Sequence, residues 1–129
     1  GVPCETYVHV SSIISSLSRV KKGSLVLENC LIKANSEIGS FCIMNSFSVV
    51  SHDCLLGNYV HLSLGAKIAG NVSIGNNVMM GVNSSVIEGV KIGNNVIMGA
   101  GRVVIDDLPD NVVAVGCPAR IIKKRVVKS

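Results

Sequence analysis

Aromatic residues and proline are scarce in this chain, whose 129 residues include no tryptophan, two tyrosines, two phenylalanines and three prolines. It contains no run of 18 apolar residues that could cross a membrane as a helix, and no signal peptide. We therefore expect a cytoplasmic protein without membrane insertion. The net charge is +4. We nevertheless do not expect nucleic-acid binding, because the sequence lacks aromatic residues that could stack on bases and lacks a recognition helix.

What the chain has instead is an unbroken period of six residues from Tyr7 to Leu108. The second position of every block is aliphatic or methionine: Val8, Ile14, Val20, Val26, Ile32, Ile38, Met44, Val50, Leu56, Leu62, Ile68, Ile74, Met80, Val86, Ile92, Met98 and Val104. The sixth position is small until Arg102 and Leu108 break the pattern. Helices repeat every 3.6 residues and alternating strands every two, so a period of six predicts a solenoid of short strands and turns.

Three such blocks make a triangular coil of 18 residues, in which residues 18 apart stack on one another. The large aliphatic residue of each block is then expected to point to the axis, with the small residue at a corner. From Asn71 onward the fifth position is asparagine or glycine as far as Gly101, and these residue types tolerate left-handed backbone torsions. The pattern predicts one all-β domain, a parallel β-helix of between five and six coils. We expect a lead-in segment at 1–6, the helix at 7–108, and a closing segment with a basic tail at 109–129.

Three of the five cysteines, Cys30, Cys42 and Cys54, occupy the small corner position at spacings of 12. This spacing puts them on different edges of the prism, so we interpret them as small core residues rather than disulfide partners or a zinc cluster. Cys4 and Cys117 lie outside the repeat, and the sequence indicates no role for them.

Basic residues gather at the end of the chain, where five of the twelve fall between Arg120 and Lys128. One interpretation is a solvated tail. The other is a patch that binds a small polyanionic ligand.

The three histidines are His9, His52 and His61. His52 falls on the outward fourth position with Asp53 beside it, an arrangement suited to taking a proton from a hydroxyl or an amine. The alternative is an ordinary surface histidine. His61 follows half a coil later and should lie on another face, so a site shared by both rings requires a second copy of the chain. No insertion interrupts the repeat to form a pocket, which favours a cyclic oligomer with sites between its subunits.

The main alternative use of these histidines is a zinc site of the kind found in gamma-class carbonic anhydrases, whose fold the predicted helix also resembles. Such a site needs three ligands, two of them a few residues apart. The three histidines here lack that spacing, so we expect no metal.

Three segments carry a resemblance to a known family: 45–70 (NSFSVVSHDCLLGNYVHLSLGAKIAG), 71–101 (NVSIGNNVMMGVNSSVIEGVKIGNNVIMGAG) and 109–124 (PDNVVAVGCPARIIKK). They resemble the sialic acid O-acetyltransferase family of hexapeptide acyltransferases, which includes N-acetyltransferases acting on UDP-4-amino-sugars and on perosamine. The resemblance implies a left-handed helix, a homotrimer and acetyl-CoA as acyl donor.

The resemblance also implies roles for individual residues, in which His52 is the general base and Asp53 supports it. His61 matches a histidine that contacts acetyl-CoA from the neighbouring subunit, and Gly70 leaves room for the thioester. The remaining matches are Asn45 near the base, Val82 and Ala100 along the pantetheine arm, and Arg120 and Lys123 at the CoA phosphates.

We therefore expect direct acetyl transfer from acetyl-CoA to an amine or hydroxyl of a sugar or nucleotide-sugar, in bacterial surface glycan biosynthesis. The alternatives are an acyltransferase for another small acceptor, such as an amino acid, and a non-catalytic oligomeric scaffold. Members of the family usually carry an N-terminal Rossmann-like domain that binds the sugar nucleotide, and this sequence begins where that domain would end. The acceptor is therefore the part of the function that the sequence specifies least.

Overall fold

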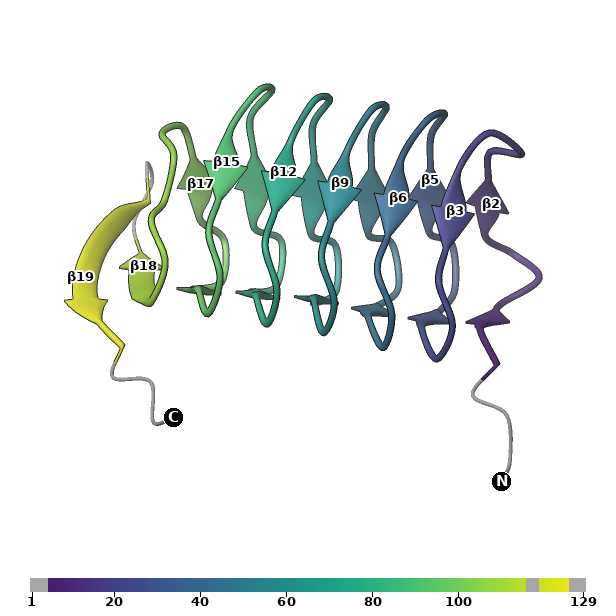
Figure 1. Ribbon diagram of the computed structural model, residues 1–129, viewed down its shortest axis with the longest axis horizontal. Coiled ribbons are helices and arrows are strands. Elements are labelled where there is room, and N and C mark those ends of the chain that lie inside the picture. Colours follow the sequence, from purple (N-terminus) through teal and green to yellow (C-terminus); the bar gives the residue numbers. More distant parts are fainter. Residues whose placement is uncertain (1–4, 116–118, 126–129) are drawn as a thin grey trace.

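The computed structural model describes residues 5–115 and 119–125, and it confirms the predicted left-handed parallel β-helix. Each strand from β1 to β17 consists of the first two residues of a six-residue block. The coils follow one another along a single axis, with β2 and β3 near one end and β18 and β19 at the other (Figure 1). None of the described residues belongs to a helix that could cross a membrane.

Three parallel sheets form the faces of the prism. The first face contains β1 (Tyr7–Val8), β4 (Leu25–Val26), β7 (Ile43–Met44), β10 (His61–Leu62), β13 (Met79–Met80), β16 (Ile97–Met98), β18 (Val112–Val115) and β19 (Arg120–Lys124). The second face contains β2 (Ile13–Ile14), β5 (Leu31–Ile32), β8 (Val49–Val50), β11 (Lys67–Ile68), β14 (Ser85–Val86) and β17 (Val103–Val104). The third face contains β3 (Arg19–Val20), β6 (Glu37–Ile38), β9 (Leu55–Leu56), β12 (Ser73–Ile74) and β15 (Lys91–Ile92).

Residues 18 apart pair in register along each face, as predicted. Leu62 pairs with Met80, and Met80 pairs with Met98. The second position of every block from Val26 to Val104 is at most 4% exposed, so these side chains form the core along the axis. Val8 is 38% exposed because the first coil is covered by a neighbouring coil on one side only.

The small corner residues are buried from Ser24 to Val96, and Cys30, Cys42 and Cys54 are free thiols, as predicted. Cys4 and Cys117 lie outside the described residues.

The fifth position of each block has a left-handed backbone conformation from Gly23 to Gly101. The sequence predicted this for the asparagines and glycines from Asn71 onward. Phe41, Phe47 and Tyr59 adopt the same conformation, which costs side chains of this size of order 1–3 kcal/mol each.

The corners are named here by the faces that they join. The fourth positions of the first corner, between the first and second faces, are Val10, Glu28, Ser46, Leu64, Val82 and Ala100. Those of the second corner, between the second and third faces, are Ser16, Ala34, His52, Gly70, Glu88 and Asp106. Those of the third corner, between the third and first faces, are Lys22, Ser40, Asn58, Asn76 and Asn94.

The third corner is closed by its own side chains. The main-chain N–H of Asn58 donates to Oδ1 of Asn76 at 2.8 Å, and that of Asn76 donates to Oδ1 of Asn94 at 2.7 Å. Asn94 donates in the same way to Asp110. This ladder satisfies the fourth-position main-chain donors of the third corner from Ser40 to Asn94.

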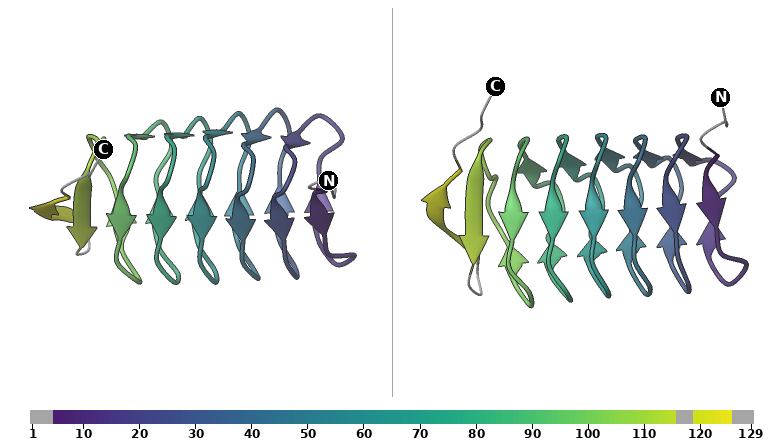
Figure 2. Two further views of the ribbon diagram at one scale, coloured as in Figure 1. Left: turned by 60° about the horizontal axis from the view of Figure 1, so that its bottom comes forward. Right: turned by 90° about the horizontal axis from the view of Figure 1, so that it is seen from below.

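The repeat gives way to a hairpin at the C-terminal end of the helix. β18 continues the first face in parallel with β16, and β19 then pairs with β18 in the antiparallel sense. The pairing between β18 and β19 shifts between Val113 and Ala114. Figure 2 shows from two further sides how these strands extend the row of coils.

Candidate active site

His52 and Asp53 form the turn of the second corner between β8 and β9. Nδ1 of His52 lies 3.0 Å from Oδ2 of Asp53, and both side chains are about half exposed, at 47% and 49%. Asp53 has a left-handed backbone conformation, with φ 57°, like the fifth position of every block from Gly23 to Gly101. The carboxylate thus accepts a hydrogen bond from Nδ1–H, and that tautomer leaves the lone pair of Nε2 free to accept a proton.

Gly70 stacks on His52 one coil further on, as the sequence predicted. A Cβ atom at Gly70 would lie 2.5 Å from Nε2 and 2.6 Å from Cε1 of the imidazole. The backbone of Gly70 is not left-handed, so this glycine is required for space and not for conformation. The space that it leaves is occupied at least in part by the imidazole ring itself.

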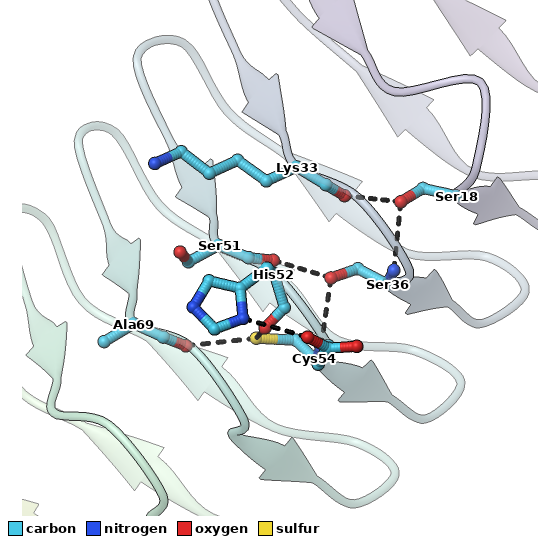
Figure 3. Close-up of polar contacts among 8 residues, drawn as sticks. Ser18, Lys33, Ser36, Ser51, His52, Cys54 and Ala69 are labelled. Carbon is cyan, nitrogen blue, oxygen red and sulfur yellow. Dashed lines mark hydrogen bonds and ion pairs between the residues drawn. The ribbon is translucent and has the colours of Figure 1, made fainter.

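A ladder of small corner residues fixes the backbone behind His52 (Figure 3). Oγ of Ser36 donates to the carbonyl of Ser51 at 2.6 Å and accepts from the main-chain N–H of Cys54 at 3.0 Å. Ser18 makes the equivalent bonds one coil earlier, to the carbonyl of Lys33 and from the N–H of Ser36. The sequence identified these positions as small but did not predict that their side chains link successive coils.

Cys54 completes this ladder and is turned away from solvent. Its Sγ donates to the carbonyl of Ala69 at 3.0 Å, and the residue is 3% exposed. Burial raises the pKa of the Cys54 thiol above its ordinary value of 9.0, and the charge of Asp53 acts in the same direction. A buried, protonated thiol is a poor nucleophile, although Cys54 lies two residues from His52.

The first and second corners differ from the third in their main-chain donors. Within residues 5–115 and 119–125, the N–H groups of His52 and Gly70 at the second corner have no protein acceptor. The same holds for Val82 and Ala100 at the first corner, among the same residues. The N–H groups of these four residues are therefore available to a ligand, whereas those of Ser40, Asn58, Asn76 and Asn94 at the third corner are occupied.

The remaining predicted site residues lie apart from His52 in a single chain. Asn45, Val82 and Ala100 belong to the first corner, at the opposite edge of the second face. His61 lies in β10 on the outer side of the first face, and Arg120 and Lys123 lie in β19. Only Asp53 and Gly70 are brought to the predicted base.

Asn45 has its side-chain carbonyl engaged locally, since Oδ1 accepts from the main-chain N–H of Ser46 at 2.8 Å. Gly116, Cys117 and Pro118 of the closing motif lie outside the described residues. In the part of the chain that the structure describes, no three His, Cys, Asp or Glu side chains are grouped to hold a metal ion.

Comparison with known proteins supports the resemblance drawn from the sequence. Residues 71–106 match the family described as hexapeptide repeat of succinyl-transferase. A GDP-perosamine N-acetyltransferase of Escherichia coli O157:H7 is 35% identical over 72 residues, which are 56% of this chain and 33% of that protein. The chain thus spans about a third of the length of this curated relative.

Two solved structures have closely similar folds. A histidine variant of GDP-perosamine N-acetyl transferase from Caulobacter crescentus, in complex with CoA and GDP-perosamine, is 41% identical with a TM-score of 0.94. That similarity covers 96% of this chain and 59% of the other. The acetyltransferase domain of PglB from Neisseria gonorrhoeae, in complex with acetyl coenzyme A, is 31% identical with a TM-score of 0.93, covering 95% of this chain and 60% of that one. In its repeat, its fold and these relatives, the chain is similar to the hexapeptide-repeat acyltransferases.

Proposed function

We propose that this chain is the catalytic β-helix of an acetyl-CoA-dependent acetyltransferase whose acceptor is an amine or hydroxyl of a nucleotide-linked sugar. The observation that carries the proposal is the pair of His52 and Asp53, with Nδ1 held at 3.0 Å from the carboxylate and Nε2 against Gly70. The similar proteins from Escherichia coli and Caulobacter crescentus, both named for perosamine N-acetylation, support this acceptor class.

His52 is proposed as the general base. Nε2 takes the proton of the acceptor nitrogen or oxygen as that atom attacks the thioester carbonyl, and Asp53 stabilises the resulting imidazolium through Nδ1–H. The thiolate of CoA then leaves as the carbonyl reforms. The acetyl group passes directly to the acceptor, because the buried thiol of Cys54 offers no nucleophile for a covalent intermediate.

The main-chain N–H of Gly70 is proposed to donate to the oxyanion that develops on the thioester carbonyl. It belongs to the residue against which the imidazole lies, and among the described residues it has no acceptor. The N–H groups of Val82 and Ala100, one coil apart at the first corner, are proposed to bind the pantetheine arm.

The test is the rate of acetyl transfer by His52→Ala, measured as CoA release with a panel of amino-sugar nucleotides. We expect a loss of about 10²-fold or more, the contribution of a general base, with unchanged folding. His9→Ala is the matched control, because its ring also has Nδ1 engaged, by Oγ of Ser11 at 2.8 Å, but lacks a carboxylate partner. Equal rates in the parent and His52→Ala would refute the assignment.

We further propose that the site is completed between the subunits of a homotrimer. In one chain, His52 and His61 lie at a corner and on a face that do not meet. The outer side of the first face around His61 also bears exposed apolar side chains, including Leu25 and Met79, which contact with a second copy would cover.

Mixing inactive variants tests this sharing. His52→Ala and His61→Ala subunits, unfolded and reassembled together, should regain activity, because some interfaces then combine an intact His52 with an intact His61. If equal amounts of the two variants assort at random in a cyclic oligomer, about a quarter of the interfaces combine both intact histidines, so about a quarter of the parent's activity should return. If each chain held a complete site, mixing would restore nothing.

The expected setting is surface glycan biosynthesis in the bacterial cytoplasm, where acetyl-CoA and nucleotide sugars are both available. Acetylation of amino-sugar nucleotides, but not of amino acids, in the same panel would support this setting. A well-folded oligomer with no turnover on any acceptor would favour the scaffold alternative.

A further inference from the structure

Lys33 lies beside the candidate base, one coil before it. It directly follows β5, and Ser51 occupies the same position one coil later, next to His52. The main-chain N–H of Lys33 donates to the carbonyl of Val50 at 3.0 Å, and its own carbonyl accepts from Oγ of Ser18. The backbone from which this side chain extends is therefore held by the coils on both sides of it.

The side chain of Lys33 is exposed and has no carboxylate partner among residues 5–115 and 119–125. The only ion pair in that part of the chain joins His52 and Asp53. Figure 3 shows the side chain of Lys33 extending on the same side of the coils as the imidazole of His52, away from the ladder of serines. A lysine ammonium group has three donors and no acceptor, and it commonly binds phosphate oxygens as a point charge. Lys33 is thus a cation beside the base that is available to an anionic ligand.

Lys33 differs in this respect from the other lysine on the second face. The outward positions of that face, which are the first and third of each block, contain no aspartate or glutamate and two lysines, Lys33 and Lys67. Lys67 occupies a first position, toward the first corner, and its Nζ donates to the carbonyl of Gly65 at 2.9 Å. Lys33 occupies a third position, toward the second corner and therefore toward His52.

The charge along the second corner changes sign at His52. Lys33 precedes the base by one coil, whereas the fourth positions that follow Gly70 are Glu88 and Asp106, both of which are exposed. The corner is therefore positive toward β5 and negative toward β14 and β17. An anionic group of a ligand that reaches His52 is attracted on the side of Lys33 and repelled on the side of Glu88.

We propose that Lys33 binds a phosphate of the acceptor, so that the acceptor reaches Nε2 of His52 from the side of β5 while the thioester lies on the side of Gly70. Successive coils are about 4.8 Å apart, so one nucleotide-linked sugar can contact Lys33 through its phosphate and His52 through its amine or hydroxyl. This inference rests on the proposed function and makes it more specific, because Lys33 then selects the nucleotide-linked sugar over the free sugar. The donor also carries phosphates, and the experiment separates the two sources.

The experiment measures CoA release by the full chain with two acceptors, GDP-perosamine and perosamine without its nucleotide, and measures inhibition of the reaction by GDP. The parent is compared with Lys33→Gln, with Lys33→Arg, and with Lys67→Gln. The last is the matched control, because Lys67 is a cation of the same face whose Nζ is engaged toward the first corner. We expect Lys33→Gln to raise the KM for GDP-perosamine and the inhibition constant of GDP about tenfold, the value of one charged hydrogen bond, with little change in kcat. Lys33→Arg should recover part of that loss, and Lys67→Gln should behave like the parent.

The pattern of changes in Lys33→Gln decides the inference. Unchanged KM values for acetyl-CoA and for free perosamine, beside the raised KM for GDP-perosamine, would assign Lys33 to the acceptor phosphate. Inhibition by GDP is a second readout that does not depend on turnover of the free sugar. A raised KM for acetyl-CoA alone, an equal loss with both acceptors, or parent-like kinetics throughout would each overturn this inference and leave the proposed function intact. Failure of the parent to acetylate any nucleotide-linked amino sugar would overturn both.

Discussion

Substitution of Gly70 by alanine tests whether the imidazole of His52 is held in place by the coil above it. The added Cβ would lie 2.5 Å from Nε2, whereas non-bonded carbon contacts are favourable at about 3.5 Å or more. The ring must therefore move by about 1 Å. The side chain is about half exposed, so it can rotate into solvent without disturbing the core.

The expected consequence is a loss of rate without a loss of stability. A displacement of about 1 Å between reacting groups costs about 10²-fold in rate, which is about 2.7 kcal/mol of activation free energy. The free energy of unfolding should change by less than about 1 kcal/mol, because the backbone of Gly70 is acceptable for alanine. The assay is CoA release under saturating donor, together with urea unfolding of the same preparations.

A double-mutant cycle distinguishes displacement of the ring from a blocked acyl site. If Gly70→Ala acts only through His52, adding it to His52→Ala costs no further rate. A similar further loss in the His52→Ala background would show that the methyl group obstructs the thioester itself. A parent-like rate in Gly70→Ala would refute the reasoning altogether.

Three further predictions concern the helix itself. Gly39→Ala should destabilise the fold by at least about 1–3 kcal/mol in urea unfolding, since its Cβ would lie 2.2 Å from the backbone carbonyl oxygen of Gly57 on the next coil. Asn76→Ala should cost about 1 kcal/mol in the same assay, because it removes the acceptor of a main-chain N–H one coil earlier; no change would mean that water replaces the bond at no cost. Burial raises the pKa of the thiols of Cys42 and Cys54 above 9.0, so the folded chain keeps protons that the unfolded chain releases, and this stabilisation is lost as the pH rises through the folded-state pKa. Between about pH 8 and about pH 10 the parent should therefore lose more unfolding free energy than a double Cys→Ser variant, and equal losses would contradict the sign.

The period of six predicted the helix in detail, because one residue type at one position per block determines which side of each strand faces the axis. Strands β1 to β17 all begin at the first position of a block. The left-handed conformations of Phe41, Phe47 and Tyr59 were not predicted, because they follow from place in the repeat and not from residue type. The terminal hairpin was not predicted either, since the repeat no longer holds beyond Leu108.

The candidate site was predicted in part for the same reason. The pairing of His52 with Asp53 and the stacking of Gly70 follow from sequence separations of one and 18 residues, which the coil converts directly into contacts. The block pattern could not predict at which corners the main-chain N–H groups find a protein acceptor. That depends on which side chains reach the main chain of the neighbouring coil, as that of Asn76 does and that of Gly70 cannot.

The number of coils also fixes the distance between residues along the first face. From β10, which carries His61, the first face continues through β13 and β16 to β18. Three interstrand steps therefore separate the histidine from the terminal hairpin of β18 and β19. At about 4.8 Å for each step, that distance is about 14 Å. Inserting or deleting one 18-residue coil between them would change the distance by about 4.8 Å while leaving each end unaltered. The number of coils thus sets the length of the ligand that can contact both ends at once. That length can be changed without changing the residues that contact the ligand.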